Sequence, residues 1–172
     1  MSRRPVYESK SPLYTPEERQ RRNATPWTIV QAVLAPIQFV VFLVSLVLVL
    51  RYLQTGDGAL AATWSVVCKT GLLYTIMVTG AIWEKEVFGC YLFARPFFWE
   101  DAVSMIVIAL HTAYLYAFVT GSLPLREQML IALAAYAAYV VNAAQFVLKL
   151  RAARRAEPTA AAHHAVKAEY AR

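Results

Sequence analysis

The stretch 27–50, WTIVQAVLAPIQFVVFLVSLVLVL, carries no charged residue over its whole length. A helix needs about 20 consecutive apolar residues to cross the hydrocarbon core of a bilayer, and this stretch exceeds that length. Three further apolar segments follow it, and we expect the four spans at about 27–52, 60–83, 97–121 and 126–149. The sequence therefore predicts an all-α, polytopic membrane protein built as a four-transmembrane-helix bundle.

The composition agrees with a membrane location. Of the 172 residues, 59% are apolar and only 16% are charged, and the mean hydropathy is +0.43. Soluble domains carry about 25% charged residues. The first 26 residues are polar and lack the short apolar region of a cleavable signal peptide, so we expect the first span to direct membrane insertion.

Three regions are expected along the chain. Residues 1–26 form an N-terminal arm, in which Thr15-Pro16-Glu17-Glu18 has the capping residues of a short interfacial helix that runs to about Arg22. Residues 27–150 form the transmembrane domain. Residues 151–172 are basic and rich in alanine, and we expect them to be a disordered tail.

The Lys and Arg residues indicate the orientation of the spans. Six of them precede the first span, two lie between spans two and three, and six lie at or beyond the end of span four. The other two connections contain only Arg51 and Arg126. Because positively charged flanks stay in the cytoplasm, both termini are predicted to be cytoplasmic. The net charge of +6 does not require a nucleic-acid partner, since basic flanks also bind anionic lipid.

The most unusual segment is WEKEVFGCYLFARPFFWED, residues 83–101, which joins spans two and three. It contains four carboxylates, two cations and seven aromatic rings. Proton donors and acceptors beside flat apolar rings suit acid–base chemistry on the edge of a large, flat substrate. Since two of the acids end span two and two begin span three, we expect them to converge. The alternative is that they form only a solvated loop.

Each span also has one polar face, because its polar residues recur at helical spacing. The faces comprise Gln31, Gln38 and Ser45 in span one; Lys69, Thr79 and Trp83 in span two; Glu100, Ser104 and His111 in span three; and Tyr139, Asn142, Gln145 and Lys149 in span four. These faces predict a bundle with a polar-lined centre. Three structural alternatives stay open. Gln31, Gln38 and Ser45 only hold the helices together, and Lys69 pairs with a carbonyl or extends toward the interface. The tryptophans at the span ends belong to an interfacial aromatic belt, which would comprise Trp27, Trp83 and Trp99.

Several segments resemble one known family. They are PLYTPEER at 12–19, VLAPIQF at 33–39, LYTIMVTG at 73–80, IWEKEVFG at 82–89, FFWED at 97–101, ALHTAY at 109–114 and YVVNAAQF at 139–146. Together they are similar to the vinyl hydratases of bacteriochlorophyll biosynthesis. The resemblance extends from about Pro12 to Arg155 and leaves out the alanine-rich tail.

The resemblance implies an enzyme that adds water to the C3 vinyl group of chlorophyllide or bacteriochlorophyllide and leaves a 1-hydroxyethyl group. It implies no redox cofactor, since the substrate brings its own magnesium. It also implies an inner membrane, either cytoplasmic or intracytoplasmic and photosynthetic, with other enzymes of bacteriochlorophyll biosynthesis as partners. The sequence has no CxxC motif and no Cys/His cluster with metal-ligand spacing.

Candidate site residues follow from this chemistry and from position in the chain. The catalytic candidates are Glu84 and Glu100, which we favour, followed by Glu86 and Asp101. For His111 two roles stay open, an axial ligand of the substrate magnesium or a proton-transfer group. Arg95 or Lys85 is a candidate for the substrate propionate. The remaining substrate-binding candidates are Trp83, Trp99, Tyr91, Asn142, Gln145 and Gln38.

Two other functions remain open from the sequence. A haem- or quinone-binding electron-transfer subunit would suit a four-helix bundle that contains a histidine, but bis-histidine haem needs a second histidine within the spans, and His111 is the only one there. A non-catalytic assembly factor for pigment complexes would use the acidic aromatic segment as a docking surface.

Overall fold

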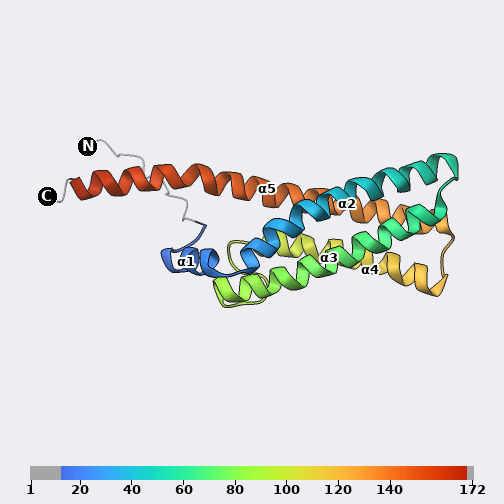
Figure 1. Cartoon of the computed structure of the whole chain (residues 1–172), viewed down its shortest axis with the longest axis horizontal. Coiled ribbons are helices and arrows are strands. Elements are labelled where there is room, and N and C mark those ends of the chain that lie inside the picture. The colour runs from blue at the N-terminus through green and yellow to red at the C-terminus, as the bar shows by residue number, and fades with distance from the viewer. Residues whose placement is uncertain (1–12, 170–172) are drawn as a thin grey trace, which may run out of the picture.

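The computed structural model describes the backbone of residues 13–169 and the side chains of residues 13–153. Within this part of the chain all regular structure is helical, which confirms the predicted all-α class (Figure 1). Four of the helices are long and apolar enough to cross a membrane. The elements are α1 (Pro16–Ala24), α2 (Trp27–Thr55), α3 (Ala59–Phe88), α4 (Phe98–Thr120) and α5 (Leu125–Glu169).

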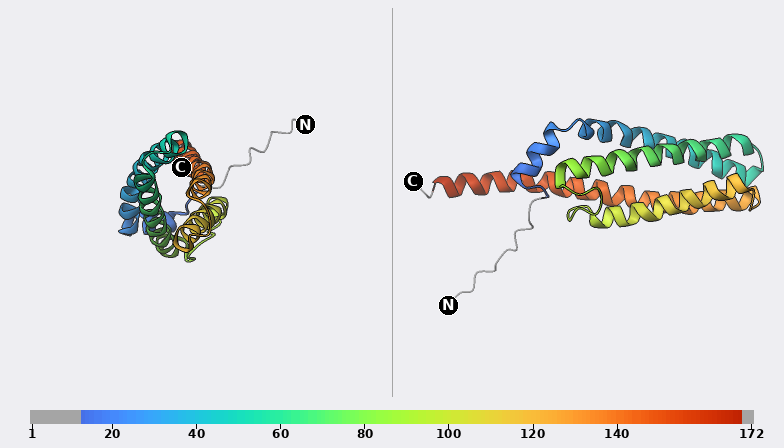
Figure 2. Two further views of the ribbon diagram at one scale, coloured as in Figure 1. Left: turned by 90° about the vertical axis from the view of Figure 1, so that its right-hand side faces the viewer. Right: turned by 90° about the horizontal axis from the view of Figure 1, so that it is seen from below.

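The four long helices form two antiparallel hairpins. In the first hairpin, α2 ends at Gly56, whose left-handed φ of 79° allows the tight turn into α3. In the second hairpin, α4 ends at Gly121 and the chain returns as α5. Helices pack closely within each hairpin and more lightly between the hairpins. An end-on view shows the four helices arranged in a ring (Figure 2).

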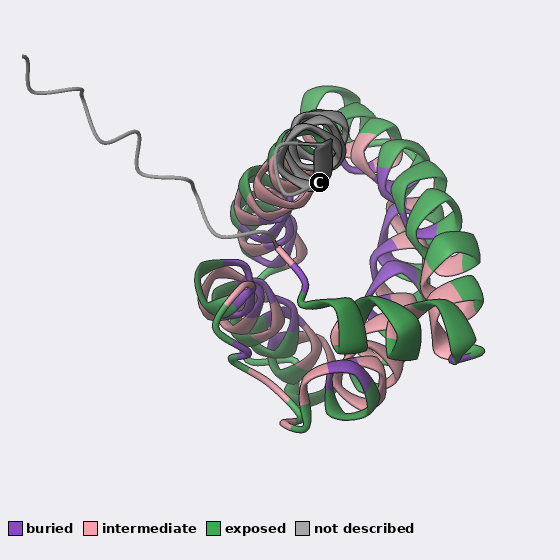
Figure 3. Ribbon diagram, turned by 90° about the vertical axis from the view of Figure 1, so that its left-hand side faces the viewer, coloured by how far each residue is buried: buried purple, intermediate pink, exposed green. Residues whose placement is uncertain are grey.

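The outer surface of the bundle is apolar. Large side chains such as Ile29, Val47, Val78 and Val119 are exposed on it, whereas the buried residues turn toward the centre of the ring (Figure 3). Monomeric soluble proteins rarely expose so much contiguous apolar surface, but the acyl chains of a bilayer would cover it. This distribution is that of a multi-pass membrane protein.

Polar side chains join the two hairpins in the interior. Ser45 of α2 hydrogen-bonds to Tyr136 of α5 (2.5 Å) and, within its own hairpin, to Ser65 of α3 (2.7 Å). The Tyr114 hydroxyl of α4 donates to the Thr63 carbonyl of α3 (3.4 Å). The predicted polar faces therefore turn inward, and part of their role is to connect helices.

The short helix α1 packs against the C-terminal part of α3. Its predicted capping box is present: the Glu18 N–H donates to the Thr15 hydroxyl (3.2 Å), and the Thr15 N–H donates to the Glu18 carboxylate (2.7 Å). Tyr14 stacks on Phe88 with ring centroids 5.8 Å apart. We call this end of the bundle, where α3 ends and α4 begins, the α1 end.

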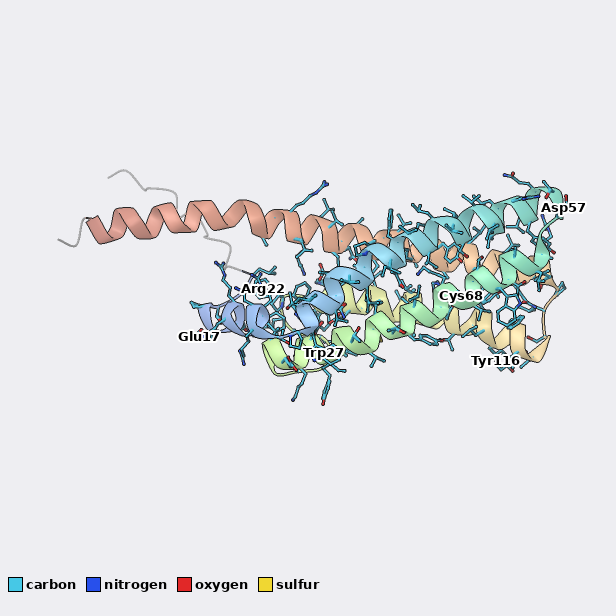
Figure 4. The ribbon with its side chains drawn as sticks, viewed as in Figure 1. Glu17, Arg22, Trp27, Asp57, Cys68 and Tyr116 are labelled. Atoms are coloured by element: carbon cyan, nitrogen blue, oxygen red, sulfur yellow. The ribbon has the colours of Figure 1, made fainter. Side chains whose placement is uncertain are left out.

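Figure 4 places Trp27 at the α1 end and Asp57 at the opposite end. Trp27 begins α2, and Asp57 lies in the turn between α2 and α3. The two residues therefore mark the two ends of the first hairpin. They also mark the two sides of the membrane that the bundle would cross.

Two helix ends differ from the sequence prediction. Helix α3 continues beyond residue 83 to Phe88, because Glu and Lys are good helix formers, and it stops at Gly89. Helix α5 continues to Glu169 through the region expected to be disordered. Alanine, arginine and glutamate favour helix, and extending an existing helix avoids the cost of nucleation.

Candidate active site

The connection between α3 and α4 folds back over the helix ends. Gly89 ends α3 with a φ of 85°, and Phe93 holds a φ of 61° within the connection. A positive φ is uncommon for a bulky residue and costs roughly 1–3 kcal/mol. It directs two successive N–H groups at carboxylates: Phe93 donates to Asp101 (2.7 Å), and Ala94 donates to Glu84 (3.2 Å). The connection is thus folded around these two acids.

Glu84 and Asp101 lie against each other at the α1 end. Both are buried, with exposed fractions of 5% and 4%, and they accept hydrogen bonds from the successive N–H groups of Phe93 and Ala94, so their carboxyl groups lie side by side. Two ionised carboxylates buried side by side repel each other and lose their solvation, so the pair is most stable when one of them carries a proton. The pair therefore holds an acid and a base side by side.

Glu100 has a different partner. Its carboxylate forms an ion pair with Lys149 of α5, and the Lys149 ammonium also donates to the Pro96 carbonyl. Asn142 of α5 donates to the Glu100 carbonyl oxygen (2.8 Å) and to the Ser104 hydroxyl (3.0 Å). These contacts fix the start of α4 against α5 and leave the pair on the side of α3. We call Glu84, Asp101, Glu100 and Lys149 together the acidic cluster.

Aromatic rings pack together at the same end. Trp83, Phe88 and Phe97 form three pairs, each with ring centroids 5.8 Å apart. Phe146 of α5 stacks on Phe97 at 6.0 Å. The Trp83 indole N–H donates to the Thr28 hydroxyl (3.0 Å), so this ring is held in place. The α1 end therefore combines carboxyl groups with flat apolar surface.

A second polar group lies deeper in the bundle. The Lys69 ammonium lies 3.9 Å from the centroid of the Tyr139 ring, and His111 packs beside Tyr136 at 5.9 Å. Both Lys69 and His111 are fully buried. Among residues 13–153, Lys69 Nζ, His111 Nε2 and Gln38 Oε1 have no hydrogen-bond partner. Because buried polar atoms are normally partnered, these atoms are available to a ligand. We call Gln38, Lys69, His111 and Tyr139 the inner polar group.

The His111 ring has a defined tautomer. Its Nδ1 lies 2.8 Å from the Val107 carbonyl oxygen, which can only accept a hydrogen bond. Nδ1 therefore carries the hydrogen, and Nε2 presents its lone pair. Histidines that bind a metal commonly donate their other ring N–H to a carbonyl in this way.

Nearly the whole chain is similar to one family of proteins. The sequence model of the 2-vinyl bacteriochlorophyllide hydratase family matches residues 14–152. The chain belongs to this family. A 2-vinyl bacteriochlorophyllide hydratase of Rhodobacter capsulatus is 66% identical over 154 residues, which cover 90% of each chain. One of Cereibacter sphaeroides is 68% identical over 142 residues, 83% of this chain and 88% of the relative. No solved structure matches the chain.

The fold of this member of the hydratase family brings together most of the site residues that its sequence predicted. Trp83 and Asn142 lie beside the acidic cluster, and Gln38 and His111 lie deeper. Gln145 lies one turn from both Asn142 and Lys149 on α5, and its buried Oε1 has no partner among residues 13–153. Within the same residues no group of three or more His, Cys, Asp or Glu side chains is arranged to hold a metal ion.

The expectation that all four acids converge is wrong for Glu86. This residue follows Glu84 by two positions, which turns it by about 200° around the helix. It is exposed and accepts a hydrogen bond from Thr25 at the start of α2. The sequence analysis favoured Glu84 and Glu100, and the structure does not pair these two acids. Asp101 faces α3 and meets Glu84, whereas Glu100 faces α5.

Three further candidates lie on the surface. Tyr91 and Trp99 have exposed fractions of 61% and 70%, and Arg95 is also exposed. Exposed Tyr and Trp at a helix end are typical of the interfacial aromatic belts of membrane proteins. The structure brings none of these three side chains into the acidic cluster.

Two lysines were missed as site residues. Lys149 and Lys69 were both on predicted polar faces, but the sequence alone did not indicate what they contact. The spacing of Asn142, Gln145 and Lys149 was the available signal for Lys149, because it places all three on one side of α5. No comparable signal indicated that Lys69 would reach Tyr139 on another helix.

The Glu100–Lys149 contact leads to an expected loss of stability. In Lys149→Met the Glu100 carboxylate would stay buried without its cation, and the free energy of unfolding should fall by roughly 1.5–3 kcal/mol. The measurement is chemical unfolding of the purified protein in detergent. In the double variant Lys149→Met/Glu100→Gln the loss should be smaller than the sum of the two single losses. Additive losses would show that this ion pair does not hold α4 against α5.

Proposed function

We propose that this protein adds water across the C3 vinyl group of chlorophyllide or bacteriochlorophyllide and so forms the 3-(1-hydroxyethyl) pigment of bacteriochlorophyll biosynthesis. Family membership supports the reaction, since relatives that share 66% and 68% identity are named 2-vinyl bacteriochlorophyllide hydratases. One observation carries the chemistry: Glu84 and Asp101 are buried side by side next to the aromatic rings. The protein is accordingly a hydratase, a carbon–oxygen lyase.

The first step is transfer of a proton to the vinyl group. The protonated member of the Glu84–Asp101 pair gives its proton to the terminal carbon, and a C–H bond forms there. Positive charge then develops on the carbon attached to the macrocycle, where conjugation spreads it over the ring. The carboxylate left behind stabilises this charge in a site of low dielectric.

The second step is attack by water. A C–O bond forms at the carbon attached to the macrocycle, and the other carboxylate of the pair accepts a proton from the water. The two carboxyl groups have then exchanged their protonation states, and their direct contact allows the proton to return before the next turnover. One water has been added with no change of oxidation state, so we propose a reaction without a redox cofactor.

We further propose that His111 ligates the substrate magnesium. Its Nε2 lone pair is buried and has no partner among residues 13–153. His111 lies ten residues beyond Asp101, a rise of ~15 Å along α4, and its ring leans back toward Val107. We propose that the macrocycle stands edge-on in the bundle, with its vinyl rim toward the acidic cluster and its central metal at His111.

The proposed setting is an inner membrane, cytoplasmic or intracytoplasmic, with the α1 end on the cytoplasmic side. The basic N-terminal arm and tail support this orientation through the positive-inside rule. A cytoplasmic acidic cluster would exchange protons and substrate with that compartment. Other enzymes of bacteriochlorophyll biosynthesis are proposed partners, since they supply the vinyl pigment and consume the alcohol.

Substituting the paired acids tests the mechanism. Glu84→Gln and Asp101→Asn should each lower turnover by about 10²–10⁴, the contribution of a general acid or base, while the protein still accumulates in membranes. The assay gives membranes containing the protein a 3-vinyl chlorophyllide and measures the product that has gained one water. Glu86→Gln is the matched comparison and should keep near-normal turnover. The mechanism is wrong if Glu86→Gln is inactive and the paired variants are active.

Magnesium ligation by His111 is tested with a metal-free substrate. If Nε2 binds magnesium, His111→Ala should weaken binding of the magnesium pigment far more than binding of the corresponding pheophorbide. Binding is measured by titration of the pigment absorbance. Equal weakening for both pigments would rule out ligation and leave His111 with a packing role.

Orientation is tested by labelling of single cysteines. In a background with Cys68→Ala and Cys90→Ala, the variants Gln20→Cys and Asp57→Cys each place one thiol at an exposed position. A membrane-impermeant maleimide added to intact cells should label only Asp57→Cys. Labelling of Gln20→Cys instead would put the acidic cluster on the other side of the membrane.

A further inference from the structure

Lys69 is a buried lysine for which the described residues supply no anion. Its side chain is fully buried near the middle of α3, and its ammonium forms no hydrogen bond or ion pair among residues 13–153. Its one described contact is the face of the Tyr139 ring, 3.9 Å away. Lysine is almost never fully buried unless it is paired.

The charged form of Lys69 is costly at this position without an anionic partner. A charge removed from water loses its solvation, and a ring face returns only part of that loss. The acids of the cluster do not offset it, since Glu100 is paired with Lys149, while Glu84 and Asp101 are paired with each other. Lys69 is therefore positioned to receive an anion from outside the protein.

The proposed substrate carries such an anion. A chlorophyllide is the free acid of the pigment, and its propionate side chain ends in a carboxylate. We propose that Lys69 binds this propionate carboxylate inside the bundle; this assignment rests on the proposed function. The new contact is a charge-assisted hydrogen bond in a dry site, where such bonds are strong.

The positions of the two polar groups support this assignment. The Lys69 ammonium lies on the Tyr139 ring and His111 packs beside Tyr136, one turn away on α5, so both face the same part of the bundle interior. A macrocycle held by its metal at His111 and by its vinyl rim at Glu84 and Asp101 has its other rings deeper in the bundle. The propionate is a flexible arm on one of those rings, and it can extend past the ring edge to Lys69.

The surface cations are weaker candidates for this role. Arg95 is exposed, and the Lys85 ammonium already donates to the Gly89 carbonyl (2.9 Å). A carboxylate bound at either residue would remain hydrated and contribute little binding energy. A carboxylate at Lys69 would instead make binding depend on the free acid, so the protein would distinguish the acid from an esterified pigment.

The test compares the free acid of the 3-vinyl pigment with its propionate methyl ester, which lacks the negative charge. Dissociation constants come from titration of pigment absorbance with the full-length protein in detergent, and turnover is measured separately. The wild-type protein should bind the acid about tenfold to a hundredfold more tightly, the range of one charge-assisted hydrogen bond. In Lys69→Met this preference should disappear through weaker binding of the acid, and in Lys69→Arg it should persist.

Two further variants are included. Thr70→Val is the matched control, because Thr70 is equally buried and its hydroxyl bonds only to the Val66 carbonyl of its own helix (2.8 Å); it should keep the acid preference. Arg95→Gln tests the surface alternative and should also keep it. A preference that survives Lys69→Met, or that is lost in Arg95→Gln, overturns the assignment.

The wild-type comparison does not depend on whether any variant folds. Equal binding of acid and ester by the wild-type protein overturns the role of Lys69, whatever the turnover. Preferred binding of the acid without formation of a hydrated product supports the carboxylate site and overturns the proposed hydratase function. The two proposals therefore fail on different measurements.

Discussion

The contact between the Glu84 and Asp101 carboxyl groups is the constraint on which the α1 end of the bundle depends. It joins the last turns of α3 to the first turn of α4, and the connection between them takes a positive φ at Phe93 to supply N–H groups to both acids. Burial of two carboxyl groups is unfavourable unless they share a proton and accept hydrogen bonds. The conditions that make this contact stable are also those that acid–base chemistry requires.

The rest of the interior extends this arrangement along the bundle axis. The acidic cluster is tied to α5 through Lys149 and Asn142, and the inner polar group lies deeper on α2, α3, α4 and α5. Hydroxyl contacts such as Ser45 with Tyr136 hold the two hairpins together without using the unpartnered atoms of the inner group. A flat pigment would thus meet acid groups at one edge and polar atoms near its centre and far side.

Much of the fold could be predicted because its signals are local. The length of the apolar segments gives the spans, and the capping box at Thr15 and Glu18 gives α1. The pairing within the site could not be predicted in the same way. Glu100 and Asp101 are adjacent in sequence, and only the packing of α4 between α3 and α5 decides which of them meets Glu84. The path of the backbone through Phe93 is likewise set by tertiary contacts that no spacing in the sequence reveals.

The central claim is that a carboxyl pair adds water and that the proton goes to the terminal vinyl carbon. The most direct test of this claim is isotope incorporation by the wild-type protein. Membranes are given the 3-vinyl pigment in D₂O enriched in ¹⁸O, and the product is analysed by mass spectrometry and NMR after exchange back into ordinary water. We expect one ¹⁸O in the hydroxyl group and one non-exchanging deuterium in the new methyl group. A product with no solvent oxygen, or with deuterium on the carbon attached to the macrocycle, would contradict the account.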